Sequence, residues 1–175
     1  HGVLEINFDE KVIFDKKREL GIENKFVLAS YGFLLPQKGI KELICAFNEV
    51  RKENKEIHLL LINAIYPVDE SLIYADECKA LIKDFSLEKD ITLVTDFLPD
   101  EESFKYLKCS DLIVMPYKQT KESASGAVRY ALSSKKPILC TPQYIFKDIE
   151  DLVHFTDTDN INSLINSLKI LLNNS

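Results

Sequence analysis

The sequence of 175 residues lacks the features that mark several large classes of protein. No apolar run reaches the roughly 20 residues that a membrane-spanning helix needs, and no segment has the pattern of a signal peptide. Acidic residues outnumber basic ones, 28 to 22, and the formal net charge of −6 argues against general nucleic-acid binding, which needs a basic face. A local basic pocket for a small anion stays compatible with this total.

Glycine, histidine and cysteine are also scarce. The five glycines do not form the three-glycine fingerprint of a dinucleotide site, and no Gly-Lys pair is followed by the Ser or Thr of a Walker A loop. The four cysteines are scattered through apolar segments, in a spacing that fits neither zinc ligands nor a disulfide framework, so we expect buried, reduced thiols. His58 and His154 have no partner at ligand spacing and are expected to be structural. The residues assemble no Ser-His-Asp or Cys-His set and no nucleophile elbow.

What the sequence does contain is an alternation of apolar strand-length runs with helical patterns. We expect a single domain over residues 1–175, although the chain begins at His1 rather than Met, which predicts a piece of a longer protein. Apolar strands that alternate with helices predict an α/β fold, a Rossmann-like, doubly wound parallel sheet of about six strands with helices on both faces, in the order 3-2-1-4-5-6. The expected strands are Phe26–Ser30, Ile57–Ile62, Ile91–Val94, Asp111–Met115, Pro137–Cys140 and Leu152–Phe155. The expected helices lie near 40–50, 72–85, 101–108, 127–132 and 161–172, the last capped by Asp159 or Asn160.

In this strand order the winding reverses between the first and fourth strands, and ligands bind at the carboxyl ends there. The loops that follow these strands, 32–39 and 116–126, are therefore expected to meet. Each precedes a helix, whose free N–H groups and positive dipole end suit a phosphate. Lys38 could reach such an anion and Gly39 would let the backbone approach it, whereas the alternative is a solvated lysine and an ordinary loop glycine.

Two acidic motifs need an interpretation. Glu122 stands beside the expected phosphate site, where a carboxylate is awkward unless it accepts hydrogen bonds from sugar hydroxyls, which favours a nucleotide sugar. The alternative is a solvated Glu122 beside Lys118 and Lys121. Asp157-Thr158-Asp159 is similar to an Asp-x-Asp metal motif, but it lies away from the switch point, so we expect turn and capping chemistry.

At these residues the sequence resembles the carboxyl-terminal, nucleotide-sugar-binding half of the family 4 retaining glycosyltransferases (glycosyl transferases group 1), which have the GT-B fold. The resemblance covers nearly the whole chain, including residues 1–3 and 17–22 before the first strand. Its remaining pieces are Tyr31-Gly32 through Lys38-Gly39-Ile40, Asp111 through Pro116, Ser125-Gly126-Ala127, and Ala131-Leu132 through Lys136-Pro137-Ile138.

The resemblance implies roles for particular residues. Gly32 would meet the donor diphosphate, Lys38 would neutralise it, and the loop with Glu122 and Ser125-Gly126 would hold the transferred sugar. The nucleobase would lie over the loops after the second and third strands, near Asn63-Ala64 and Phe97-Leu98. No metal or other cofactor is implied, because cationic side chains and a helix N-terminus stabilise the leaving diphosphate.

Three positions depart from the family's pattern. Tyr130 stands where the family has the glutamate that holds the ribose hydroxyls. Phe33 or Leu35 stands where it has a phosphate-binding arginine, and Lys135 where it has a glycine. We therefore count Phe33 and Tyr130 among the donor-site residues, with an unusual or weakened contact at each.

The resemblance also implies a function. The chain is expected to be the donor-binding half of a glycosyltransferase that moves a hexose in bacterial surface glycan synthesis, in the cytoplasm at the inner face of the membrane. Its partners would be a nucleotide sugar and a missing amino-terminal, acceptor-binding half, which would make any membrane contact, and the chain alone would be inactive. Its catalytic residues remain unidentified. The alternatives are a non-catalytic regulatory or scaffolding domain that has lost donor binding, and half of a nucleotide-sugar epimerase.

Overall fold

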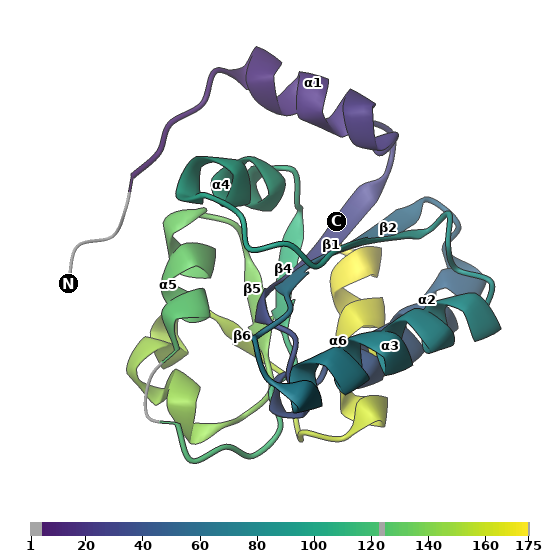
Figure 1. The fold of residues 1–175 in the computed structure, drawn as a ribbon, viewed down its shortest axis with the longest axis vertical. Coiled ribbons are helices and arrows are strands. Elements are labelled where there is room, and N and C mark those ends of the chain that lie inside the picture. Colours follow the sequence, from purple (N-terminus) through teal and green to yellow (C-terminus); the bar gives the residue numbers. More distant parts are fainter. Residues whose placement is uncertain (1–4, 123–124, 175) are drawn as a thin grey trace.

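The computed structural model describes residues 5–122 and 125–174 as six parallel strands and their covering helices (Figure 1). The similarity expected for residues 1–3 lies outside the described residues. The strands are β1 (Phe26–Phe33), β2 (Ile57–Ala64), β3 (Ile91–Val94), β4 (Leu112–Met115), β5 (Ile138–Cys140) and β6 (His154–Phe155). The helices are α1 (Glu10–Leu20), α2 (Ile40–Glu53), α3 (Asp69–Asp84), α4 (Asp100–Lys108), α5 (Gly126–Ser133) and α6 (Ile161–Asn173), with 3-10 helices η1 (Pro36–Lys38) and η2 (Tyr144–Leu152).

The strands form one sheet in the order β3-β2-β1-β4-β5-β6, and every neighbouring pair is parallel. This is the doubly wound order that the sequence predicts. The chain runs from β1 outward to β3, then returns to the other side of β1 with β4, so the winding reverses between β1 and β4. Their carboxyl ends therefore frame the switch point at which ligands bind in such sheets.

Side chains alternate between two cores on the two faces of the sheet. Leu59 and Leu61 of β2 pack with α2, α3 and α6, whereas Leu60 and Ile62 pack with α4, α5 and η2. Figure 1 shows the same layering, with α2, α3 and α6 on one side of the strands and α4 and α5 on the other. None of the helices in the described part of the chain combines the length and hydropathy of a membrane span.

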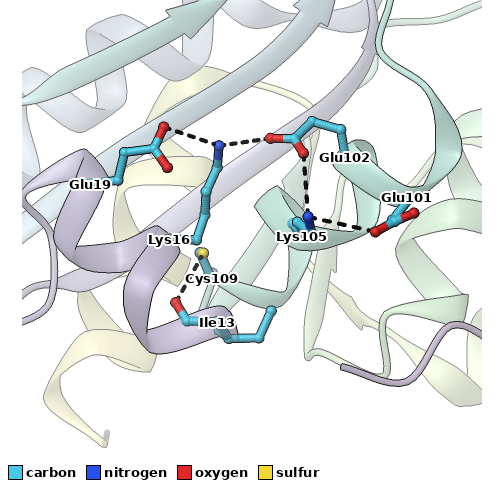
Figure 2. Close-up of polar contacts among 7 residues, drawn as sticks. All are labelled: Ile13, Lys16, Glu19, Glu101, Glu102, Lys105 and Cys109. Carbon is cyan, nitrogen blue, oxygen red and sulfur yellow. Dashed lines mark hydrogen bonds and ion pairs between the residues drawn. The ribbon is translucent and has the colours of Figure 1, made fainter. Parts of the chain in front are cut away.

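Helix α1 was not predicted, and it lies outside α4 as an added layer (Figure 1). Its inward face is formed by Ile13, Lys16 and Leu20, so a lysine interrupts the apolar pattern that would have revealed it. Lys16 is buried, and its Nζ lies 2.7 Å from Glu102 Oε1 of α4 and 3.5 Å from Glu19 (Figure 2). This ion pair holds α1 against α4.

Two further details differ from the sequence prediction. Leu72 was expected on the inner face of α3 but is 50% exposed, because Ser71 faces inward and donates to the Leu34 carbonyl at 2.7 Å. The last strand was expected from Leu152, but β6 is short and Leu152 belongs to η2 with its side chain exposed. The helix cap expected at Asp159 or Asn160 is Asn160, whose Oδ1 accepts from Ser163 N at 2.9 Å.

Candidate functional site

The two loops at the switch point are in contact, as the topology predicts. Lys118 N donates to the Gln37 carbonyl at 2.8 Å, which joins the loop after β4 to the loop after β1. Gly39 has φ +73°, and a Cβ added there would lie 1.9 Å from the Pro116 carbonyl oxygen. Gly39 was expected to admit an anion, but the close approach it permits is that of Pro116.

A cavity of about 490 Å³ opens where these loops meet the carboxyl ends of the strands. It brings together residues that are remote in sequence, including all seven donor-site residues singled out from the sequence and three of the four nucleobase residues. These are Gly32, Phe33, Lys38, Glu122, Ser125, Gly126 and Tyr130, together with Ala64, Phe97 and Leu98. Their convergence is a geometric fact, whereas their part in binding a donor stays a prediction.

Asn63 is the one site residue that the structure does not bring to the cavity. Its neighbours Ile62 and Ala64 line the cavity, whereas Asn63 is 1% exposed and its Nδ2 donates to the Gly32 carbonyl at 3.3 Å. Successive side chains of a strand point to opposite faces, so a residue between two lining residues points away. Asn63 supports the backbone of β1 and does not face a nucleobase.

Lys38 is the cation of the cavity, and it is not solvated. The residue is 8% exposed, and its Nζ lies 3.1 Å from Glu122 Oε2 and 4.4 Å from the centre of the Tyr117 ring. Because a buried ammonium needs a partner, Glu122 and the ring face stabilise its charge. Lys118, beside which the alternative placed a solvated Glu122, pairs with Glu42. An anion that enters the cavity therefore meets a lysine whose charge Glu122 already balances.

The start of α5 presents backbone amides to the cavity. Ser125 is its N-cap residue but makes no side-chain capping bond, because its Oγ lies 3.1 Å from the Tyr117 hydroxyl. Gly126 and Ala127, the first residues of the helix, line the cavity. Uncapped N–H groups at a helix start favour an anion. Burial raises the pKa of Tyr117 to about 12, so this hydroxyl stays neutral and serves as a hydrogen-bonding group.

Gly32 makes room for α5. With φ +134°, it adopts a conformation that L side chains rarely reach, and an added Cβ would lie 3.2 Å from Ala127 Cβ. A glycine here lets the end of β1 and the start of α5 approach each other. This part of the cavity therefore depends on the close approach of Gly32, at the end of β1, to the Ala127 side chain of α5.

Aromatic side chains form two walls of the cavity. At one end Phe33 packs edge-to-face on Tyr66, with centroids 4.9 Å apart, and stacks on Phe97 at 6.0 Å. At the other end Tyr130 stacks on Tyr31 at 5.1 Å and on Phe104 at 5.4 Å. These rings favour a ligand that has a planar group.

Tyr130 also carries a hydrogen bond that the sequence did not reveal. Its hydroxyl donates to Asp100 Oδ1 at 2.7 Å, and this bond raises the pKa of Tyr130 to about 12.

The other two positions that depart from the pattern implied by the resemblance are Lys135 and Phe33. Lys135, where the resemblance implies a glycine, has φ +60° and keeps the left-handed conformation that a glycine adopts easily. Phe33 lines the cavity where the resemblance implies an arginine, and it brings a ring and no charge.

Sequence reasoning missed several residues of the cavity wall. Two of them, Tyr66 and Asp96, lie just after β2 and β3, at the same carboxyl edge that singled out the two loops. The third is Ser103. Ser103 is an exception because it lies within α4, where its Oγ accepts from the Tyr31 hydroxyl at 3.2 Å.

His58, His154, the four cysteines and the Asp157-Thr158-Asp159 segment lie outside this cavity. Three of the cysteines are buried and Cys45 is half-buried, and all four are free thiols. His58 is buried with its Nε2 2.8 Å from Thr92 Oγ1, and burial lowers its pKa to about 4. Thr158 makes local turn contacts of the kind predicted for that segment, since its N donates to Ser163 Oγ and its Oγ1 accepts from Asn160 N, whereas Asp159 accepts from the distant Gln143.

Comparison with known proteins identifies the group to which this architecture corresponds. The family model for glycosyl transferases group 1 matches residues 12–175. No curated protein matches the chain. Among solved structures, Anabaena Alr3699/HepE in complex with UDP and glucose superposes with a TM-score of 0.80 at 17% identity, covering 94% of this chain and 43% of that one.

Two further structures extend the comparison. The carboxyl-terminal domain of a glycosyl transferase group 1 family protein (LpcC) from Francisella tularensis has a TM-score of 0.76 at 17% identity and covers 98% of this chain and 85% of that domain. WaaG, a glycosyltransferase involved in lipopolysaccharide biosynthesis, has a TM-score of 0.74 at 15% identity, and the match covers 95% of this chain and 43% of WaaG. The chain thus spans less than half the length of HepE and WaaG, and nearly all of the isolated domain.

Proposed function

This chain belongs to the glycosyl transferases group 1 family, and from that premise we propose that its cavity binds the nucleoside diphosphate sugar donor of a retaining glycosyltransferase. One observation carries the proposal: a buried lysine and an uncapped helix start converge on one cavity at the switch point of the sheet. Both groups favour an anion there, and no other feature of the cavity requires them to be together.

Different parts of the cavity bind the diphosphate, the sugar and the base of the donor. The diphosphate lies between Lys38 and the first amides of α5, which together stabilise the charge that develops on the leaving group. Glu122, half-exposed beside Lys38, accepts hydrogen bonds from hydroxyls of the sugar. The planar base packs against Phe33 and Phe97, next to Leu98. The UDP and glucose bound by Anabaena HepE support a ligand of this class.

The rest of the proposal concerns the whole enzyme. The acceptor and the remaining catalytic groups come from an amino-terminal half, so this chain alone binds a donor without transferring its sugar. The sugar is a hexose, the reaction retains its configuration and needs no metal, and the product is a bacterial surface glycan made at the cytoplasmic face of the membrane. The involvement of WaaG in lipopolysaccharide biosynthesis supports this setting.

Two features favour a second candidate, a regulatory or scaffolding domain that has lost donor binding. Glu122 already balances the charge of Lys38, and Phe33 lines the cavity where the resemblance implies an arginine. An arginine–diphosphate contact that is not replaced is worth about 1.5–3 kcal/mol. One binding experiment separates the two candidates.

Isothermal titration of this chain with a panel of nucleoside diphosphates and their glucose conjugates tests the proposal. We expect saturable binding of at least one diphosphate, weakened by about 2 kcal/mol, or thirtyfold, in Lys38→Met. Lys41→Met is the matched control, because Lys41 is exposed, pairs with Glu77 and lies outside the cavity. Absence of binding across the panel would support the second candidate, and equal losses in both variants would refute the role of Lys38.

A further inference from the structure

The opposite, amino-terminal edge of the sheet carries a second hollow, an open cleft of about 610 Å³ between α1, the end of α4 and the turn before β5. It lies where β4 and β5 begin, whereas the cavity lies where the strands end. Eight residues line it: Phe8, Glu10, Lys11, Ile13, Phe14, Lys17, Lys108 and Lys136. We call this hollow the lysine cleft.

Positive charge dominates the lysine cleft, although the chain as a whole is acidic. Four lysines line it against one carboxylate, that of Glu10, in a protein of net charge −6. Within residues 5–122 and 125–174, no carboxylate lies within 4 Å of the ammonium groups of Lys11, Lys17, Lys108 or Lys136. Among the described residues these ammonium groups make one polar contact, the bond from Lys108 Nζ to the Ser134 carbonyl at 2.9 Å.

The neighbouring lysines on the same two helices are treated differently. Lys16 of α1 lies between Glu19 and Glu102, and Lys105 of α4 lies between Glu101 and Glu102 (Figure 2). Lys135, beside the cleft, pairs with Glu5. Carboxylates are therefore available in this part of the molecule, yet among the described residues Glu10 is the only one that lines the lysine cleft.

The ammonium groups of the cleft act on one another and on the core beneath. Burial and then the charges of Lys136 and Lys135 lower the pKa of Lys108. Lys17 and Lys136 both favour the ionised form of the Cys109 thiol, although burial raises its pKa to about 11. The lysines are thus close enough to repel, and an anion between them would relieve that repulsion.

The walls of the lysine cleft are fixed and partly apolar. The Lys16–Glu102 pair clamps α1 on α4, and Cys109 Sγ contacts the Ile13 carbonyl at 4.0 Å (Figure 2). Phe8 and Phe14 line the cleft, and Phe14 is 52% exposed. A large apolar side chain left in solvent beside unpaired lysines suits a ligand that is anionic at one end and apolar at the other.

We propose that the lysine cleft binds a phosphate group that carries an apolar portion, independently of the donor cavity. The four ammonium groups hold the phosphate, and the rings of Phe8 and Phe14 contact the apolar portion. A free phosphorylated compound and a lipid headgroup share this chemistry. The proposal does not depend on donor binding, because its residues lie at the other edge of the sheet.

Amide NMR of the chain with inorganic pyrophosphate tests binding of a free phosphorylated compound. Sedimentation with vesicles of phosphatidylcholine, with and without phosphatidylglycerol, tests binding of a lipid headgroup. We expect shifts of the Lys108 and Lys136 amides, or sedimentation that requires phosphatidylglycerol. In Lys17→Gln/Lys136→Gln the affinity should fall about fivefold for each lysine removed. Neither lysine forms an ion pair with another residue that the structure describes, so the fold should persist.

Two controls locate the effect. Lys41→Gln/Lys52→Gln removes the same charge from exposed positions on α2 and should leave binding within twofold of the wild type, whereas Lys38→Met should abolish only shifts at the donor cavity. Binding of neither pyrophosphate nor anionic vesicles would overturn the proposal. Equal losses in the two double variants would also overturn it, because they would show that net charge alone is responsible.

Discussion

The two edges of this one sheet handle lysine in opposite ways. At the carboxyl edge Lys38 is buried, and Glu122 and the Tyr117 ring balance its charge. At the amino edge the four cleft lysines have no carboxylate within 4 Å among the described residues; Lys11 is exposed, and Lys17, Lys108 and Lys136 are half-buried. A fully buried ammonium group requires a partner, whereas one that contacts solvent does not. The carboxyl edge therefore holds its lysine in a specific ion pair, and the lysines of the amino edge have positive charge with which a ligand can interact.

The difference extends to the backbone. The cavity depends on glycines whose conformations allow two loops and a helix start to touch, whereas the lysine cleft depends on side chains that project from three separate elements. We therefore expect the carboxyl edge to tolerate few substitutions and the amino edge to tolerate many. Four predictions sharpen this contrast, from the largest expected effect to the smallest.

Gly39→Ala should lower the free energy of unfolding by about 4 kcal/mol, since it combines a strained φ of +73° with a Cβ that overlaps the Pro116 carbonyl. Gly21→Ala is the matched control: its φ is +70°, but nothing lies within 4 Å of the added Cβ, so about 1 kcal/mol is expected. Urea unfolding measures both. Equal losses would mean that the contact between the two loops does not contribute.

His58, at the amino end of β2, should make stability depend on pH. Burial lowers its pKa from 6.5 to about 4, so the unfolded chain binds more protons between these values and the free energy of unfolding falls as pH drops through them. The full effect is about 3 kcal/mol. In His58→Gln the decrease in the free energy of unfolding should be smaller by about 3 kcal/mol. Denaturant unfolding at pH values between 6.5 and 4 measures it. His154→Gln, which changes an exposed histidine, should behave as the wild type; a wild-type pH profile in His58→Gln would contradict the assignment.

Glu122→Gln should tighten diphosphate binding by about 1 kcal/mol, because it removes the carboxylate that competes with the ligand for Lys38. The effect is modest since the Glu122 side chain is 42% exposed. Glu42→Gln removes a carboxylate from the neighbouring Lys118 pair, outside the cavity, and should leave affinity unchanged. Weaker binding in Glu122→Gln would show that Glu122 contacts the ligand more strongly than it competes with it.

Tyr130→Phe should lower the free energy of unfolding by about 0.5–1 kcal/mol, the worth of one hydrogen bond, while its ring keeps its stacking on Tyr31 and Phe104. The variant should also lose a phenol that ionises near pH 12, which absorbance titration detects. Tyr144→Phe, at an exposed residue, is the control for both measurements. A loss of several kcal/mol would indicate that the ring has moved.

The sequence predicted the strand order because parallel, fully buried strands have apolar runs that alternate with helices, and chain order then constrains topology. The same topology predicted that the two loops would meet. Helix α1 was missed because Lys16 occupies an inward position, with its charge balanced by Glu102, a residue 86 positions away. No local pattern reveals a partner at that distance.

The candidate site was predictable to the level of loops but not of side-chain directions. The resemblance placed Asn63 at the nucleobase, but a shift of one residue reverses the face to which a strand side chain points, and Ala64 lines the cavity where Asn63 does not. The pairing of Lys38 with Glu122, 84 positions apart, depends on the path of an irregular loop. Periodicity describes helices and strands, and such loops have no period from which a contact can be inferred.

The aromatic walls of the cavity give the protein an optical property. The sequence contains seven tyrosines and no tryptophan, so its intrinsic ultraviolet emission comes from tyrosine alone. Three of these tyrosines, Tyr31, Tyr66 and Tyr130, line the cavity. A chromophore seated against them quenches a large share of the emission, and occupancy can therefore be followed in the unlabelled protein by fluorescence.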